Sequence, residues 1–205
     1  HDVLLAMDEA HTNAFAYGGL TRLWSIDPDL QTVGKGLGSG FPFSAYGMTG
    51  ALAAISEQRL DRDREGGVGL MIGGTTYASA LGLTVARTCL ETCLTESAYA
   101  ENAERGDQLA SGLENLFRQR GLNWQAPHVG GRSGWVLSPE LPRTASESAY
   151  SLDRDFTMAK RLFMLTHGVW EAISSAGPAA SFAHSANDVD EYLKTSAAFL
   201  DEAMA

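Results

Sequence analysis

The chain has 205 residues, of which 44% are apolar, so it is long enough to bury a substantial core. Its formal net charge of −10 at neutral pH argues against nucleic acid or an anionic membrane surface as the main partner. No apolar run approaches the length of a membrane span, and no basic-then-apolar signal opens the sequence, so we expect no membrane partner.

The first predicted element is a strand over residues 3–7, which is apolar throughout and is followed by Asp8 and Glu9. A continuous apolar strand is typical of a sheet that is covered on both faces. Open α/β sheets bind their ligands at the carboxyl ends of the strands, where Asp8 lies. The alternative for Asp8 alone is a strand-end cap or a turn residue.

An aromatic, glycine-containing loop is predicted over residues 12–24, then a turn at 27–29 and a short strand over residues 30–33. Loops at this edge of a sheet carry specificity, so the first loop is either the wall of a substrate pocket or a packing surface.

Lys35 follows the second strand and is surrounded by glycines. It is the only lysine before Lys160 in a chain with twelve arginines and three lysines. A lysine can lose its proton near neutral pH and attack a carbonyl as a free amine, which an arginine cannot do. Flanking glycines let a planar ligand approach the backbone. Taken alone, Lys35 could equally be a solvated surface residue.

Asp8 and Lys35 together indicate a pyridoxal-phosphate site. A carboxylate that faces a pyridine nitrogen keeps that nitrogen protonated and makes the ring an electron sink. The amine supplies the group that bonds covalently to the aldehyde. Each residue has an ordinary structural explanation, and it is their joint occurrence that favours the site.

Residues 36–47 are too rich in glycine for a helix or a regular strand, and we expect neither there. The segment lacks the ending of a P-loop and opens no dinucleotide-binding unit, so we reject a nucleotide site. A helix is predicted over residues 50–60, then a charged, exposed connection over 61–69.

A second helix is predicted over residues 78–92, with one face formed by Leu81, Val85, Cys89 and Leu90 or Cys93. The glycines and threonines before it, including Gly74 and Thr75, form either an anion site at the helix N-terminus or a simple N-cap at Thr75 or Thr76. With no His, Asp or third Cys close by, the two cysteines are expected to be packing residues in a reducing compartment, with no metal site and a cytoplasmic location.

A long helix is predicted over residues 97–120, with Gly121 as its stop. Its inner stripe and flank are Leu109, Leu113, Leu116, Phe117 and Arg120. We expect it to link a large domain, residues 1–120, to a small α+β domain, residues 121–205. In the small domain we expect strands near residues 135–137, 169–173 and 180–183, a polar loop over 138–151 and a helix over 152–167. A final helix is expected, with Ser185 or Asn187 as its cap. Its inward-facing residues are expected to be Val189, Tyr192, Leu193, Phe199 and Leu200.

Six segments in the same order resemble the class III aminotransferases, nearest to the branch of glutamate-1-semialdehyde aminomutase and β-amino-acid transaminases. They are residues 8–11 (DEAH), 27–30 (DPDL), 32–42 (TVGKGLGSGFP), 45–47 (AYG), 73–81 (GGTTYASAL) and 181–190 (SFAHSANDVD). The resemblance covers nearly the whole chain. It implies an α/β fold, namely the C-terminal part of a fold-type-I large domain plus a small α+β domain.

The resemblance also implies roles for single residues. The residue matching Asp8 contacts the pyridine nitrogen, the one matching Ala10 packs on the ring, and Lys35 forms a Schiff base with pyridoxal phosphate. His11 stands where some relatives contact the ring hydroxyl, and an ordinary structural histidine is the alternative. Gly74 and Thr75 match a segment whose threonine reaches the cofactor phosphate of the neighbouring subunit, which implies a homodimer with shared sites. The continuation differs, because residues 77–80 read YASA where the family usually has Ser-Gly-Asn-Pro.

The implied substrates are an amino donor and a keto-acid or semialdehyde acceptor. Arg22 and Arg132 are candidates to bind a substrate carboxylate, because the guanidinium matches it bidentately, although either could be a surface residue. Glu171 and His184 lie near where relatives line the small-domain side of the site. The sequence does not identify the substrate.

Three hypotheses stay open at this point: an aminotransferase, an aminomutase that moves the group within one molecule, and a non-catalytic fragment or a subunit that needs a partner. The third arises because family members are about twice this length. The part that carries their phosphate loop and their stacked aromatic residue has no counterpart here. We therefore expect weak or no cofactor retention by the 205 residues alone.

Overall fold

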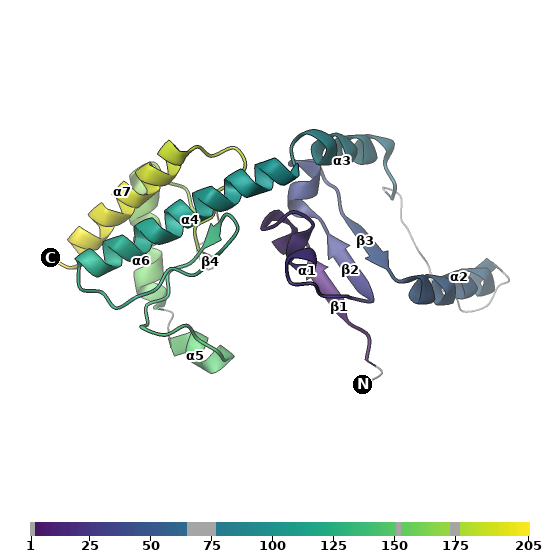
Figure 1. The fold of residues 1–205 in the computed structure, drawn as a ribbon, viewed down its shortest axis with the longest axis horizontal. Helices are drawn as coiled ribbons and strands as arrows, with labels where there is room; N and C mark the ends of the chain where they lie inside the picture. Colours follow the sequence, from purple (N-terminus) through teal and green to yellow (C-terminus); the bar gives the residue numbers. More distant parts are fainter. Residues whose placement is uncertain (1–2, 65–76, 151–152, 173–176) are drawn as a thin grey trace. The chain divides into compact units, whose positions relative to one another are not determined.

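The computed structural model of the chain describes residues 3–64, 77–150, 153–172 and 177–205 (Figure 1). It divides into two compact units, His1–Glu96 and Ser97–Ala205. The sequence suggested a domain boundary at residue 120, whereas the long helix before that point belongs to the second unit. The assignment of residues 1–120 and 121–205 to two domains of the complete protein stays a prediction.

The first unit contains a three-stranded sheet in the order β1 (Ala6–Glu9), β2 (Leu30–Val33), β3 (Ala45–Met48). Strands β1 and β2 are parallel and place Asp8 opposite Thr32, while β3 runs antiparallel to β2 and places Tyr46 opposite Thr32. The strand predicted at residues 30–33 is confirmed. The register puts the carboxyl ends of β1 and β2 side by side.

The expectation of a buried strand over residues 3–7 is wrong in two respects. Strand β1 begins only at Ala6, and Val3 and Leu4 before it are 80% and 66% exposed. An apolar composition shows that a segment is able to pack against another one, and not that it does so. Within the ranges that the structure describes, no segment covers these side chains.

Short helices connect the strands. Helices η1 (Thr12–Ala14) and α1 (Gly19–Leu23) lie between β1 and β2, and η2 (Lys35–Gly38) follows β2. The prediction of no regular structure over residues 36–47 is therefore wrong, because η2 and β3 both enter that range. A tight helical turn and a short strand tolerate glycines that a long element would not.

Helix α2 (Gly50–Arg64) confirms the helix predicted at residues 50–60 and extends it. Residues 61–64, expected to begin a connection over 61–69, instead form the last turn of this helix. Arginine and glutamate have helix propensities as high as those of many apolar residues, so a charged segment can continue a helix. The remainder of that connection lies outside the described residues.

Helix α3 (Ala80–Thr92) is preceded by Ser79, whose hydroxyl accepts a hydrogen bond from the Gly82 amide at 3.4 Å. The N-cap is thus Ser79, rather than Thr75 or Thr76, which lie outside the described residues. The buried face of the helix consists of Gly82, Ala86 and Cys89, whereas Leu81 and Leu90, expected on that face, are exposed. Small residues let α3 pack closely on the glycine-rich turn η2, which explains the difference.

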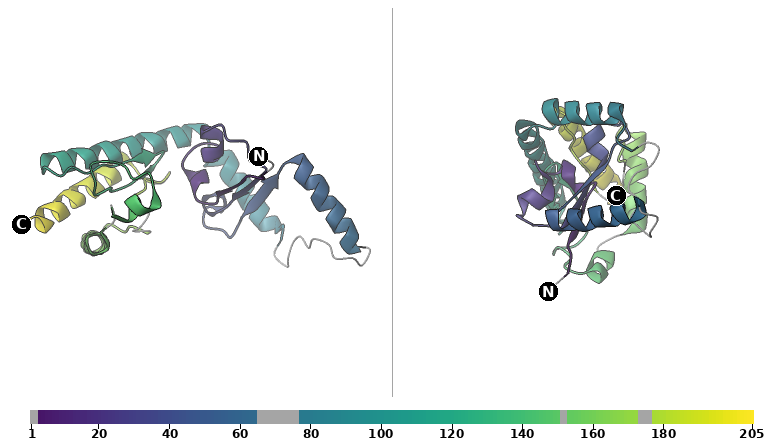
Figure 2. Two further views of the ribbon diagram at one scale, coloured as in Figure 1. Left: turned by 90° about the horizontal axis from the view of Figure 1, so that it is seen from below. Right: turned by 90° about the vertical axis from the view of Figure 1, so that its right-hand side faces the viewer.

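The second unit is built on three helices, α4 (Glu96–Gln119), α6 (Arg154–Thr166) and α7 (Ala186–Ala203). Helices α4 and α7 lie side by side (Figure 2), and Gln108 of α4 donates a hydrogen bond to Asp190 of α7 at 2.7 Å. Helix α4 is followed by Gly121 with a φ of 69°, as expected for its stop.

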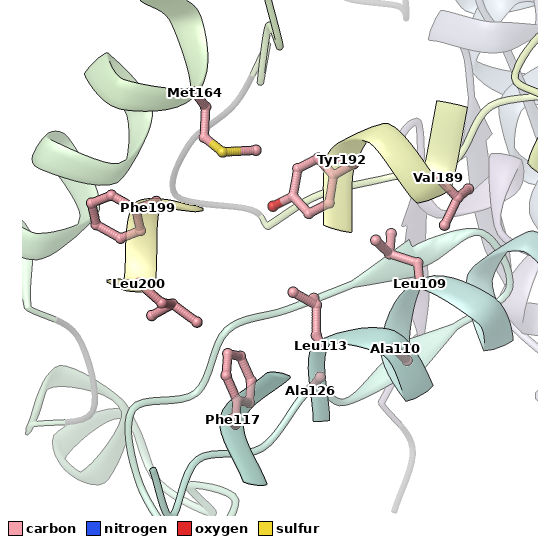
Figure 3. Packing of buried hydrophobic residues seen from close by; sticks show 10 residues of the cluster. All are labelled: Leu109, Ala110, Leu113, Phe117, Ala126, Met164, Val189, Tyr192, Phe199 and Leu200. Atoms are coloured by element: carbon pink, nitrogen blue, oxygen red, sulfur yellow. The ribbon is translucent and has the colours of Figure 1, made fainter. Parts of the chain in front are cut away.

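The core of the second unit lies between these helices (Figure 3). Its buried members are Leu109, Ala110, Leu113, Phe117, Ala126, Met164, Val189, Tyr192, Phe199 and Leu200. The predicted inner faces of α4 and α7 are thereby confirmed, with Leu116 and Leu193 partly buried against the core. Ser185 caps α7 through a capping box with Asp188, as expected for one of the two candidate caps.

The strands predicted for this unit are largely wrong. The structure forms a two-stranded sheet of β4 (His128–Val129) and β5 (Arg132–Ser133). Residues 135–137 contribute one isolated bridge, through Val136, and the described part of 169–173 and residues 180–183 contain no strand. Helix α5 (Ala145–Tyr150) stands in the loop expected at 138–151, while the helix expected at 152–167 is confirmed as α6. Strands this short depend on non-local partners, which local sequence patterns do not reveal.

Candidate functional site

A cavity of about 1010 Å³ opens in the first unit at the carboxyl ends of β1 and β2. This is the position where open α/β sheets hold ligands, and the volume is in the upper range for small-molecule sites. The residues that line it are Asp8, Ala10, Thr32, Val33, Gly34, Lys35, Pro42, Phe43, Ser44, Ala45, Tyr46, Tyr77, Ala78, Ser79, Gly82 and Leu83. All of them belong to the first unit.

Asp8 is held by two hydrogen bonds that both reach its Oδ1 atom. The Ala10 amide donates at 2.9 Å, and the Thr32 hydroxyl, directly across the sheet, also donates at 2.9 Å. These two bonds, together with the charge of Lys35, lower the pKa of Asp8 below its ordinary value. Asp8 is therefore ionised at neutral pH, and both of these bonds within the described residues reach Oδ1 rather than Oδ2.

Lys35 is the first residue of η2 and lies directly after β2. Its main chain has a φ of 46°, in the left-handed region that is unfavourable for residues other than glycine. The turn is anchored from the other side, because Leu37 and Gly38 are buried and Ser39 Oγ lies 2.8 Å from Cys89 Sγ of α3. The fold thus presents the lysine to the cavity from a turn that is fixed at its base.

Of the predicted site residues, the structure brings Asp8, Ala10 and Lys35 together on this cavity. His11 is not among the lining residues, and its ring lies 5.9 Å from that of Phe15. Gly74 and Thr75 lie outside the described residues. The roles of all of these residues stay predictions.

The two arginines proposed for substrate binding lie in different units. Arg22 is on α1, where its guanidinium stacks 4.9 Å from the centre of the Tyr17 ring. Arg132 is on β5 of the second unit, and burial lowers its pKa. Neither lines the cavity.

Glu171 and His184, both expected near the site, have partners within the second unit. Glu171 is buried and forms an ion pair with Lys160, at 2.7 Å between Oε1 and Nζ. His184 Nδ1 accepts a hydrogen bond from the Ser181 amide at 3.1 Å.

Sequence reasoning did not find the hydroxyl groups of the site. Thr32 is a direct partner of Asp8, and Ser44, Tyr46 and Ser79 line the cavity. The signal for Thr32 was present, since parallel pairing of residues 6–9 with 30–33 puts it opposite Asp8. The others depend on the path of the chain after Lys35, for which no periodic pattern exists.

Replacing Thr32 by valine is expected to raise the pKa of Asp8, because the isosteric side chain cannot donate. Since the folded protein favours ionised Asp8, this group stabilises the fold above the ordinary pKa of aspartate, and the contribution is lost as the pH falls through the lowered value. The substitution should narrow the pH range over which ionised Asp8 stabilises the fold. A carbon-detected NMR titration of the Asp8 carboxyl measures the change in its pKa. Thr84→Val is the control, as Thr84 donates only to the Ala80 carbonyl. An unchanged Asp8 titration in Thr32→Val would contradict the assigned bond.

Comparison with known proteins identifies relatives along almost the whole chain. The chain is 32% identical over 201 residues to the glutamate-1-semialdehyde 2,1-aminomutase of Paracidovorax citrulli, covering 93% of this chain and 43% of that protein. Its structure matches that of a glutamate-1-semialdehyde aminomutase from Pseudomonas aeruginosa with a TM-score of 0.86 and 25% identity, over 98% of this chain and 45% of that one. A β-phenylalanine aminotransferase from Variovorax paradoxus shares the fold, with a TM-score of 0.84 at 24% identity over 98% and 44% of the two chains. No family model matches the sequence.

The chain belongs to the class III pyridoxal-phosphate-dependent aminotransferases. The family and the α/β fold expected from the sequence are thereby confirmed. The chain spans less than half the length of the relatives it matches.

Two further properties concern the described ranges. No helix in residues 3–64, 77–150, 153–172 or 177–205 combines the length and the apolar character needed to cross a membrane. The same ranges contain no cluster of three or more His, Cys, Asp or Glu side chains that could hold a metal ion.

Proposed function

We propose that the complete protein containing this chain is a pyridoxal-phosphate-dependent aminotransferase. It would transfer an amino group between an amino acid or amine and a keto acid or semialdehyde. The observation that carries the proposal is the presence of Asp8 and Lys35 on one cavity at the carboxyl edge of the sheet. Membership of the class III family supports it.

The residues of the cavity fit this cofactor. One carboxylate and one amine, the two groups that a pyridine ring bearing an aldehyde requires, reach the same space. Ala10, Gly34 and Gly82 add little bulk to its wall, which suits a flat ring. At Gly34 and Gly82, a Cβ atom would make ordinary van der Waals contact with Ser44 and Phe41, at 3.5 and 3.4 Å.

When bound, pyridoxal phosphate supplies an aldehyde that reacts with amines and a protonated ring that withdraws electrons. Asp8, kept ionised by Ala10 and Thr32, would hold the proton on the ring nitrogen through its Oδ2 atom. Lys35 would hold the aldehyde covalently through Nζ. Released as a free amine, it would take up and return the proton of the substrate α-carbon.

Further parts of the proposal concern the assembly and the substrate. We propose a homodimer with shared sites, in which Gly74 and Thr75 serve the cofactor phosphate of the neighbouring subunit. Arg22 and Arg132 stay the proposed partners of a substrate carboxylate, and neither lines the cavity in the first unit. The cytoplasm is the proposed location, in keeping with two free cysteines, Cys89 and Cys93.

An aminomutase is the second candidate function, because the relatives reported above include proteins named glutamate-1-semialdehyde 2,1-aminomutase. It needs the same residues but retains the reacting molecule in a closed site. Release of a keto product and dependence on a separate amino acceptor would favour the aminotransferase. Conversion of one substrate without an acceptor would favour the aminomutase.

The test is borohydride reduction of the complete protein in the presence of pyridoxal phosphate, followed by peptide mass analysis. We expect the cofactor mass on the peptide that carries Lys35, and no such mass in a Lys35→Ala variant. A Lys194→Ala variant is the control, because that side chain is 77% exposed on α7. An unmodified Lys35 peptide would refute the proposal. The same reaction on the isolated 205 residues is expected to give little product, and stoichiometric labelling there would exclude the hypothesis of a fragment that needs a partner.

A further inference from the structure

The carboxylate next to Asp8 is the most completely buried charged group of the first unit that the structure describes. Glu9 has 0% of its surface exposed. It accepts hydrogen bonds from the Thr12 hydroxyl at 2.6 Å, the Leu20 amide at 3.1 Å and the Thr21 amide at 2.5 Å, and a fourth from the Thr21 hydroxyl. Burial alone would raise the pKa of Glu9, but these bonds lower it overall, so the group is ionised at neutral pH.

The four donors come from two separate elements. Thr12 begins η1, and Leu20 and Thr21 are in the first turn of α1. A Cβ atom on Gly19 would lie 2.7 Å from both oxygens of the Glu9 carboxylate, so the main chain closes directly over it. The segment from Ala10 to Gly19 is therefore tied to the end of β1 at its beginning and at its end.

Glu9 and Asp8 project to opposite sides of β1, because successive side chains of a strand alternate. Asp8 lines the cavity, and Glu9 is buried under η1 and α1. Ala10, which donates one of the two hydrogen bonds to Asp8, lies in the short link between Glu9 and Thr12. The Ala10 amide thus belongs to the segment that the Glu9 bonds anchor.

We infer that Glu9 is a positioning residue for Asp8: by fixing the chain from Ala10 to Thr21, it keeps the Ala10 amide on the carboxylate that faces the cavity. The role of Asp8 toward a cofactor rests on the proposed function. The positioning of Asp8 by Glu9 is a property of the chain itself. Glutamine cannot replace Glu9 fully, since its amide NH₂ would face the N–H group of either Leu20 or Thr21, and an N–H group cannot accept a hydrogen bond.

The test measures the pKa of Asp8 by NMR titration in the complete protein without added cofactor. Glu9→Gln is expected to raise it by roughly half a pH unit or more, in the same direction as Thr32→Val. Thr32→Val removes one of the two donors to Asp8, whereas Glu9→Gln loosens the segment that holds the other donor, the Ala10 amide. Leu94→Ala, which removes a buried side chain of the same unit, controls for loss of stability, and Glu104→Gln controls for loss of one surface charge. Neither control should shift Asp8.

A second measurement follows cofactor retention. Glu9→Gln should weaken it by roughly tenfold, the effect of one lost hydrogen bond to a charged group, and Glu9→Asp should restore part of it. Should Glu9→Gln fail to fold, Thr12→Val and Thr21→Val carry the test, each with a smaller shift of Asp8 in the same direction.

The outcomes separate the two proposals. An Asp8 pKa that is unchanged in Glu9→Gln, or that moves equally in Leu94→Ala, overturns the positioning role whatever the cofactor does. A wild-type protein that is not labelled at Lys35 overturns the proposed function, while a shifted Asp8 in the same preparation still supports the role of Glu9.

Discussion

Replacing Lys35 by alanine is expected to lower the turnover of the complete protein by at least about 10²- to 10⁴-fold, the contribution typical of general acid–base catalysis alone. The substitution removes the amine that reaches the cavity, and with it both the covalent attachment and the proton transfer proposed for it. Steady-state and single-turnover kinetics with the best amino donor measure the loss. An added small primary amine should restore part of the rate, because it can enter the space left by the side chain.

Two variants control this result. Lys35→Arg keeps the positive charge but cannot act as a free amine near neutral pH, and it should be as inactive as alanine. Lys194→Ala removes an exposed lysine and should leave turnover unchanged. Retention of more than a tenth of the activity in Lys35→Arg would show that the amine chemistry is wrong.

Replacing Glu171 by alanine is expected to destabilise the second unit by about 3–5 kcal/mol, the usual effect of breaking a buried ion pair. Both side chains of the pair are 4% exposed, and Lys160 Nζ lies 2.7 and 3.0 Å from the two carboxylate oxygens. Tyr192 donates a third bond to Glu171 at 2.6 Å. Burial lowers the pKa of Lys160, and the charge of Glu171 opposes that shift, so removal of the carboxylate leaves a costly buried ammonium group. Urea unfolding at neutral pH measures the change.

The matched control is Glu191→Ala, which breaks the exposed pair with Lys194 at 3.4 Å and should change stability by less than about 1 kcal/mol. A double variant, Lys160→Met with Glu171→Leu, should recover most of the loss, because apolar residues of similar volume can replace a buried pair. Equal effects of Glu171→Ala and Glu191→Ala would show that the pair does not contribute as its burial implies.

The features that the sequence predicted correctly are those with a local cause. Strand β2, the stop of α4 at Gly121 and the cap of α7 at Ser185 each follow from a residue type acting on its immediate neighbours. Asp8 and Lys35 both line one cavity, and the sequence joined them as an acid at the end of a strand and a lysine among glycines. Their roles there stay predictions.

The features that were wrong or not foreseen depend on contacts between distant segments. The buried face of α3 consists of Gly82, Ala86 and Cys89, and a hydrophobicity pattern gives such small residues little weight although their size permits the contact with η2. In the sequence, Glu9 is one of two adjacent acidic residues, and its hydrogen bond with Thr21 forms only in the folded chain. The same holds for Lys160, whose partner Glu171 lies 11 residues further along the chain, beyond the end of α6.

The left-handed backbone conformation of Lys35 has a consequence for sequence design and for the mutations that this turn accepts. A left-handed conformation costs roughly 1–2 kcal/mol for a residue with a side chain, and glycine or asparagine adopts it more easily. A procedure that optimised this turn for foldability alone would therefore discard the lysine and erase the amine that the cavity presents. The turn is a point of local frustration, where the demands of folding and of chemistry are opposed at a single residue.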